Sequence, residues 1–199
     1  MGTRGLTMVI ANAETKVAQY GQWDHYPSGQ GAYILNFLQK TDLKKFKEKL
    51  KTVRFMDDED QKKVDLFLTT MGCKDGWMNM EQAEKYKEMF PYLSRDIGSK
   101  ILELINLSDG REVLLVDSSE FAGDSLFCEW GYVIDLDKNT FEVYKGFNQK
   151  PLNKKDRFFH LPKEKDYYPI KLIKSFKLTN LPSHNEFLEV LEEKEEEVE

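Results

Sequence analysis

Side chains able to do chemistry are concentrated in one short connection near the start of the chain. The stretch Tyr20–Gly31, YGQWDHYPSGQG, places acidic, imidazole, aromatic and glycine residues between an expected hairpin and an expected helix. Asp24 and His25 are adjacent there, and an imidazole that titrates near neutral pH suits proton transfer. The two residues are therefore the candidate catalytic pair, or a pair of groups that hold a ligand.

The same loop offers further groups for binding. Trp23 and Tyr26 carry flat, partly polar rings on which a base or a sugar can stack. Backbone N–H groups at Gly29 and Gly31, just before a helix, can receive an anion, and Ser28 stands beside them. These five residues are the candidate ligand-binding groups of the loop.

A structural interpretation of the loop has comparable weight. Asp24 could cap a turn, Trp23 and Tyr26 could fill the core, and the glycines could satisfy backbone geometry. Gly-x-Gly by itself is a weak signal, and the loop lacks the GxxxxGK[ST] pattern of a phosphate-binding P-loop.

Arg4, between Gly2 and Gly5, is the second candidate for ligand binding. An arginine that enters a strand beside glycines can bind a carboxylate or phosphate in bidentate fashion. If the first two strands pair, Arg4 lies at the same end of the sheet as the loop after Tyr20. The alternative is a salt bridge from Arg4 to Asp24 or another carboxylate.

Carboxylates farther along could complete a hydrolytic site. Glu129 and Asp135 fall on one face of a later hairpin, and Asp117 ends a neighbouring strand. Together with Asp24 they could form a divalent-metal site of the kind used in phosphodiester hydrolysis. Acidic residues on strands are more often solvated or paired, so we expect no metal and no other cofactor.

Composition limits the classes of partner. The chain of 199 residues has a net charge of −6 and a pI near 5.3, which argues against general nucleic-acid binding. Local basic stretches remain at residues 44–54 and 150–157. No apolar run approaches the length of a membrane span, and two distant cysteines predict free thiols. We expect a cytoplasmic protein without membrane contact and leave its oligomeric state open.

Hydrophobic periodicity predicts the elements that position these groups. Strands are expected at residues 6–11, 16–20, 113–116, 127–136, 140–145 and 170–178. Helices are expected from residue 31, at 42–53, 58–71, 79–90 and 94–107, and after residue 183. Two capping boxes are expected, one from Asp58 to Gln61 and one from Asn79 to Gln82.

The order of these elements predicts an α+β fold. We expect an antiparallel or mixed β-sheet, with a four-helix block inserted between the N-terminal hairpin and the later strands. Residues 1–190 would form a single domain, 31–108 its mainly helical part, and 191–199 an acidic, disordered tail. The lack of regular β-α-β alternation argues against a doubly wound nucleotide-binding fold.

Two motifs carry a resemblance. The segment Gly2-Thr3-Arg4-Gly5, followed by the loop Tyr20–Gly29, resembles a widespread group of uncharacterised bacterial and phage proteins. Those proteins open with a GTRG-like strand and carry a Tyr-Pro-x-Gly-x-Gly loop. The resemblance covers roughly the first forty residues. It supports the position of a site and implies no chemistry for it.

Three functions follow as hypotheses. The first is binding of a small anionic, nucleotide-like ligand by the loop 20–31 together with Arg4. The second is a hydrolase acting on such a ligand, with His25 as acid/base and Asp24 or Glu129 orienting it. The third is a protein–protein interaction module whose exposed aromatic side chains contact a partner chain, for which a large apolar surface patch would be the sign.

Overall fold

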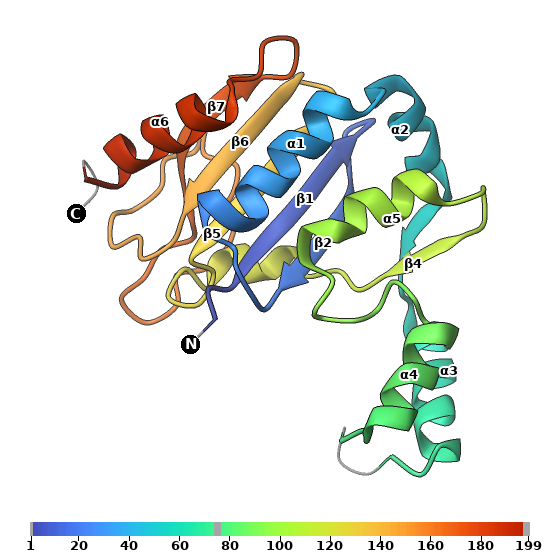
Figure 1. The fold of residues 1–199 in the computed structure, drawn as a ribbon. Helices are drawn as coiled ribbons and strands as arrows, with labels where there is room; N and C mark the ends of the chain where they lie inside the picture. The colour runs from blue at the N-terminus through green and yellow to red at the C-terminus, as the bar shows by residue number, and fades with distance from the viewer. Residues whose placement is uncertain (1, 74–76, 197–199) are drawn as a thin grey trace.

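A five-stranded mixed β-sheet forms the centre of the molecule (Figure 1). The computed structural model describes residues 2–73 and 77–196, with side-chain burial to residue 192. The strand order is β2-β1-β5-β6-β7, with β1 Gly5–Ala11, β2 Glu14–Gly21, β5 Trp130–Asp135, β6 Thr140–Lys145 and β7 Lys171–Lys177. β1 and β5 are parallel, whereas the other neighbouring pairs are antiparallel. The predicted α+β class is confirmed.

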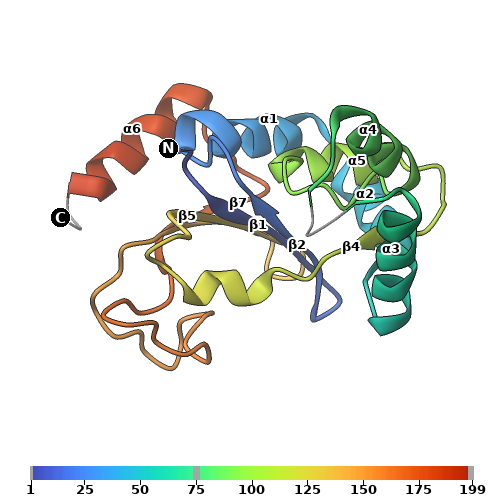
Figure 2. The ribbon, with the colours of Figure 1, turned by 90° about the horizontal axis from the view of Figure 1, so that it is seen from below.

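Helices cover one face of this sheet, and loops with a short 3-10 helix cover the other (Figure 2). The first face carries α1 Ala32–Lys40, α5 Ile101–Leu107 and α6 His184–Glu196, and the second carries η4 Ser119–Gly123. Side chains along β5 alternate between two cores, because Tyr132 and Ile134 pack on the helical side and Val133 on the other. The central strands are therefore buried on both faces.

The segment between β2 and β4 differs from the predicted four-helix block. Its described part holds five α-helices, and a short strand, β3 Val53–Phe55, interrupts them. β3 pairs in parallel with β4 Val113–Leu115 in a second sheet. The prediction continued a helix through Val53 on periodicity alone, but α2 Leu43–Lys49 ends earlier. A β-branched residue with a partner strand available favours extended backbone, and that partner is remote in sequence.

Two helices form a hairpin that projects from the rest of the molecule. They are α3 Asp58–Thr70 and α4 Met80–Met89, and both ribbon views show them beyond the edge of the main sheet (Figures 1 and 2). Their attachments are the chain leaving β3 and the segment that leads to α5. The hairpin therefore has fewer neighbours to pack against than α1 or α5.

Capping boxes start both helices of the hairpin. Asn79 Oδ1 accepts from the N–H of Gln82 at 2.9 Å, and Gln82 Oε1 accepts from the N–H of Asn79 at 2.8 Å, as predicted. In α3 the box joins Asp57 and Asp60, one residue before the predicted start at Asp58. The box begins at Asp57 because Asp60 Oδ2 accepts from the Asp57 N–H at 3.3 Å, and Asp57 Oδ1 accepts from the Asp60 N–H at 2.9 Å. An arginine described below also binds the Asp60 carboxylate.

α6 continues beyond the expected start of the tail. Phe187 and Leu191 are buried in the core on the helical face, and the helix runs to Glu196. The predicted disordered tail therefore began too early, because Leu191 still lies one helical turn after Phe187 and packs on the same side. Residues 197–199 lie outside the described residues.

Candidate functional site

The pairing of β1 with its neighbours brings the predicted site residues to one end of the sheet. Gly5 lies opposite Gly21 on β2 and opposite Trp130 on β5. Arg4 precedes this row, and the loop 22–31 follows it. The predicted proximity of Arg4 and the loop is thus present in the backbone register.

The imidazole of His25 lies directly on this row of glycines. A Cβ added at either Gly5 or Gly21 would collide with the ring, and the residue is fully buried. Glycine at both positions leaves the space that the ring occupies. The two glycines, which pair across β1 and β2, therefore both provide space for the His25 ring.

Hydrogen bonds hold His25 in this position. Its N–H donates to the carbonyl of Thr3 at 3.1 Å, and its own carbonyl accepts from the Tyr132 hydroxyl at 2.8 Å. In the ring, Nδ1 lies 3.3 Å from the carbonyl oxygen of Trp23, and Nε2 is buried with no hydrogen-bond partner among the described residues. Burial lowers the pKa of His25 to about 4, and the hydrogen bond with Trp23 offsets this only in part. The ring is therefore neutral at physiological pH.

Asp24 and His25 do not form the predicted catalytic pair. Asp24 is exposed and adopts a φ of 57°, while its carbonyl accepts from the N–H of Gln30 at 2.8 Å. His25 points inward, where the partner of its Nδ1 is a backbone carbonyl. An enclosed ring cannot exchange protons with a substrate on the surface. The structure gives His25 a packing role in place of the predicted acid/base role.

The backbone donors of the loop are used within the loop. Pro27–Gly31 forms a π-helical turn, η1, in which the N–H groups of Gly29 and Gly31 donate to the Tyr26 carbonyl at 3.0 and 3.2 Å. A Cβ at Gly29 would also collide with the carbonyl of Asp24. These glycines serve close packing, which conflicts with the predicted use of their N–H groups to receive an anion.

Two aromatic side chains of the loop remain accessible. Trp23 is 51% exposed and Tyr26 is 48% exposed, and Ser28 is exposed as well. The Trp23 ring covers Gly2, where an added Cβ would collide with it. Of the predicted ligand groups in the loop, these three side chains present surface to solvent at this end of the sheet.

Arg4 lies on the opposite face of the sheet from His25. Its guanidinium carbon is 4.3 Å from the centre of the Phe127 ring, a cation–π contact. Its backbone N–H donates to Glu129 Oε1 at 3.3 Å. Because neighbouring residues of a strand point to opposite faces, Arg4 points away from the side on which Gly5 meets His25. The structure therefore separates the two groups that the hydrolase hypothesis combined.

The carboxylates proposed as metal ligands lie in separate places and do not form one site. Asp117 Oδ1 accepts from the N–H and the hydroxyl of Ser119, at 2.9 and 2.6 Å. Glu129 accepts from the backbone N–H of Arg4, and Asp24 lies exposed on the surface of the loop. Within residues 2–73 and 77–192, no three His, Cys, Asp or Glu side chains gather closely enough to hold a metal ion.

A buried charged network on the second face of the sheet was missed by the sequence interpretation. Arg157, expected in a basic loop, donates to Asp135 Oδ2 at 2.7 Å and to Glu142 Oε2 at 2.9 Å. The Tyr144 hydroxyl donates to the same Glu142 oxygen at 2.6 Å. The usable signal was Tyr144, because it lies two residues after Glu142 and so shares with it the face of β6 opposite to Phe141 and Val143.

Hydrogen bonds offset the effect of burial on the carboxylate of Asp135 in this network. Burial raises the pKa of the Asp135 carboxyl, but hydrogen bonds from the Lys138 N–H and from Arg157 outweigh it and leave the pKa below its usual value. Both carboxylates are therefore occupied by one arginine, and the network attaches the loop that carries Arg157 to the sheet.

The lysine-rich helix α2 is engaged in local contacts. Lys47 Nζ bonds to Asp137 at 2.8 Å, Lys49 Nζ bonds to the carbonyl of Ser108, and Lys51 pairs with Glu48. Three of the cations in this basic stretch thus hold neighbouring parts of the chain.

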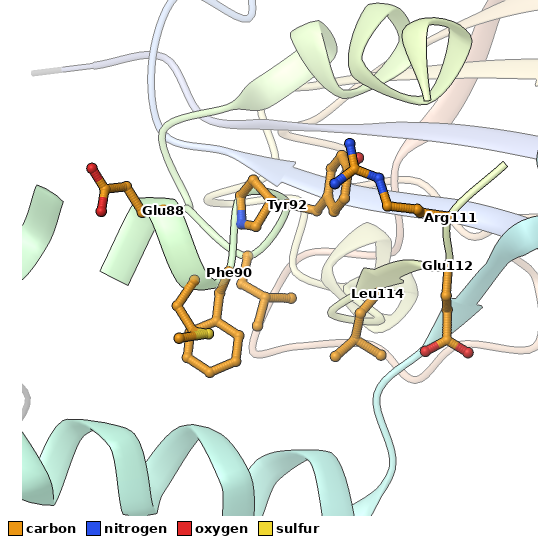
Figure 3. Close-up of a pocket in the computed structure, with 9 residues that line it drawn as sticks. Glu88, Phe90, Tyr92, Arg111, Glu112 and Leu114 are labelled. Atoms are coloured by element: carbon orange, nitrogen blue, oxygen red, sulfur yellow. The ribbon is translucent and has the colours of Figure 1, made fainter. Parts of the chain in front are cut away.

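Two pockets border the α3–α4 hairpin, and Figure 3 shows the first of them. A pocket of about 390 Å³ lies between the end of α4 and the chain that enters β4. It is lined by Glu88, Met89, Phe90, Pro91, Tyr92, Leu93, Arg111, Glu112 and Leu114. A second pocket, of about 350 Å³, lies along α4 and shares Leu93 with the first. None of the predicted site residues lines either pocket.

Large apolar side chains are exposed on the same hairpin. Trp77 is 83% exposed and Met80 is 84% exposed. The exposed apolar residues of the hairpin are Leu66, Trp77, Met78, Met80 and Met89. Sequence reasoning recognised the two helices but did not predict that their apolar residues lack a covering layer.

Comparisons with known proteins add no assignment. No protein-family model, curated protein or solved structure matches this chain. Among the described residues, no helix combines the length and the apolar character needed to cross a bilayer.

Proposed function

We propose that this protein is a protein–protein interaction module that binds a partner polypeptide through its α3–α4 hairpin. The observation that carries the proposal is the exposure of large apolar side chains on a projecting hairpin that also borders two pockets. Large apolar side chains left exposed on one element are typical of an interaction site.

Burial within the hairpin supports this proposal. Of the described residues, α3 buries Asp60 and Val64, and α4 buries none. The contact between the helices rests on rings, with Phe67 and Phe90 meeting edge to face at 5.3 Å between centroids and Tyr86 beside Phe90. Two helices joined in this way leave apolar area that a third element could cover.

The types of exposed residue fit recognition of a polypeptide. Trp77 is among the residue types that contribute most to interface energies. Met78, Met80 and Met89 have flexible, polarisable side chains that adapt to the shape of a partner. A surface that combines one indole with several thioethers suits a helix or an extended segment with an apolar face.

The base of the hairpin is held to the rest of the molecule by Arg54 on β3. Its guanidinium pairs with Asp60 of α3 and with Glu112, whose Oε2 lies 2.7 Å from Arg54 Nε. The Asp60 side chain is 5% exposed, so this anchor is largely protected from water on the α3 side. An anchored hairpin loses less conformational freedom on binding than a free one.

Affinity capture with matched variants tests the proposal. Trp77→Ser with Met80→Ser removes apolar surface from the hairpin, and we expect it to lose the partners that the wild-type protein retains from a lysate of its source. The control is Leu107→Ser, since Leu107 is a 71% exposed residue on α5 outside the hairpin. Equal capture by the hairpin variant and the wild type, with both folded by circular dichroism, would refute the proposal.

A second candidate function is retained for the end of the sheet. The half-exposed rings of Trp23 and Tyr26 favour stacking of a small planar anion, with Arg4 nearby in the backbone register. Native mass spectrometry with a nucleotide and metabolite extract tests it. A retained mass that is lost in Trp23→Ala and kept in Trp77→Ser would support this candidate, whereas no retained mass would remove it.

A further inference from the structure

The pocket at the base of the hairpin has apolar walls and charged ends. Phe90, Leu93 and Leu114 line it from α4, from the segment after it and from β4. Glu88 lies on one side of the pocket, with Arg111 and Glu112 on the other (Figure 3). A volume of about 390 Å³ is enough for one or two large side chains.

Ion pairs compensate most of the charges around this pocket. Arg111 Nε is engaged by Asp109 Oδ1 at 2.7 Å, so one carboxylate already compensates that cation. Arg54 is shared between Glu112 and the buried carboxylate of Asp60. Lys63 also pairs with Asp60, at 3.3 Å, so three cations face three carboxylates before Glu88 is counted.

Glu88 adds a fourth carboxylate. It forms no direct ion pair within the part of the chain that the structure describes. The nearby Lys85 bonds to Glu81 at 2.7 Å, and Glu81 first, with Glu88 after it, raises the pKa of that lysine. The position of Glu88 at the end of α4 leaves it at the rim of the pocket, in contact with water. The rim therefore carries one carboxylate, Glu88, more than its cations compensate, beside an aromatic and aliphatic interior.

We infer that this pocket receives a lysine or arginine side chain from an amphipathic helix of the partner. This inference rests on the proposed function and specifies the chemistry of the partner. The aliphatic stem of a lysine or arginine would pack against Met89 and Leu114, and its charged end would reach Glu88 or Glu112. The rings of Phe90 and Tyr92 suit a cation in addition.

Charge also argues against a second copy of this chain as the occupant. Each copy has a net charge of −6, so two copies repel each other at long range. A basic helix is attracted to Glu88, and its apolar face can cover the exposed Met89 that lines the pocket.

Two synthetic peptides test the inference. Each is an amphipathic helix of about 18 residues, or about 27 Å, with the same leucine and alanine face. One carries lysine and arginine on its flanks, and the other carries glutamate at the same positions. Binding to the full chain is measured by fluorescence anisotropy, and the site is located by NMR of ¹³C-labelled methionine methyl groups, in which Met89 reports on the pocket.

We expect the basic peptide to bind and to shift the Met89 methyl signal, with affinity that falls as salt rises. Glu88→Lys should weaken this binding about tenfold, since it reverses a charge at the rim. The matched control is Glu189→Lys, on an exposed position of α6, which changes the net charge equally and should bind like the wild type. Equal weakening by both variants would overturn the inference.

The remaining outcomes separate this inference from the proposed function. Equal binding of both peptides at the hairpin would overturn the basic partner and leave the interaction module in place. Binding of neither peptide, with partner capture still dependent on Trp77 and Met80, would do the same. A dimer in light scattering that shifts the Met89 methyl signal would assign the pocket to a second copy. Loss of both peptide binding and hairpin-dependent capture would remove the proposed function as well.

Discussion

The carboxylate of Asp137, in the turn between β5 and β6, accepts a hydrogen bond from the backbone N–H of Ala13 at 2.8 Å. Its other oxygen accepts from the N–H of Asn12 at 3.0 Å and from Lys47 Nζ at 2.8 Å. One side chain therefore joins the β1–β2 turn, its own turn and α2. Asn12 and Ala13 both have positive φ, 57° and 61°, as a two-residue type I′ hairpin turn requires.

Ala13→Gly should stabilise the protein. Alanine is strained in the left-handed region, and glycine relieves this at some cost in unfolded-state entropy, so we expect a gain of about 0.5–1 kcal/mol. Urea unfolding at pH 7 measures the change in free energy. Ala83→Gly, on α4, is the control and should lower stability, because alanine has ordinary helical backbone there. A loss of stability in Ala13→Gly would contradict the assigned turn.

Asp137→Ala should destabilise the protein at neutral pH and much less in strong acid. Hydrogen bonds from the Ala13 N–H, from Lys47 and from the Asn12 N–H lower the pKa of Asp137 to about 2. Because the folded pKa is depressed, this stabilisation is complete above the unfolded pKa near 4 and disappears as the pH falls toward 2. Thermal unfolding from pH 7 to pH 2 measures the difference between variant and wild type. A difference that stays constant over this range would contradict the prediction, and Asp166→Ala at an exposed loop position is the control.

His25 should make stability fall as the solution is acidified. Burial lowers the folded pKa to about 4 from 6.5, so the unfolded chain binds a proton in this interval that the folded protein excludes. The free energy of unfolding is therefore highest above pH 6.5. It falls by about 3 kcal/mol between pH 6.5 and 4. Urea unfolding of the wild type and His25→Gln at pH 7.5 and 4.5 measures it.

The variant should show a weaker loss of stability between these two pH values than the wild type. His160→Gln, at an exposed position, should keep the wild-type dependence. Equal pH dependence in His25→Gln and the wild type would mean that the imidazole is accessible to water.

Arg157→Met should destabilise the protein by about 3–5 kcal/mol, since it leaves the carboxylates of Asp135 and Glu142 buried without their cation. Adding Asp135→Asn and Glu142→Gln to this variant should recover part of the loss, because the remaining groups are neutral. Urea unfolding of the single and triple variants measures both effects. If the single variant is as stable as the wild type, the network does not contribute to the free energy of unfolding and the prediction is wrong.

Local sequence patterns determined most of the secondary structure. Alternating side chains predicted β1, β5 and β6, the helical spacing of apolar residues predicted α1 and α3, and a capping pattern predicted α4. The box of Asn79 and Gln82 was predictable because both partners lie within one helical turn. These features depend on neighbours three or four residues away, which the sequence shows directly.

Features that depend on remote partners were not predictable in this way. Val53 lies in a strand because Val113 is opposite it, and Arg157 is partly buried because two strands present carboxylates to it. The sequence alone does not show that these residues, which are far apart along the chain, lie close together in space.

The candidate site illustrates the same division. The sequence by itself determined that an aromatic, glycine-rich loop would follow the second strand and lie near Arg4. Only the tertiary structure decided that His25 would point inward onto Gly5 and Gly21, while Trp23 and Tyr26 stayed at the surface. It also decided that the apolar faces of α3 and α4 would lack a covering layer, because the direction of a side chain and the burial of a helix depend on how distant elements pack.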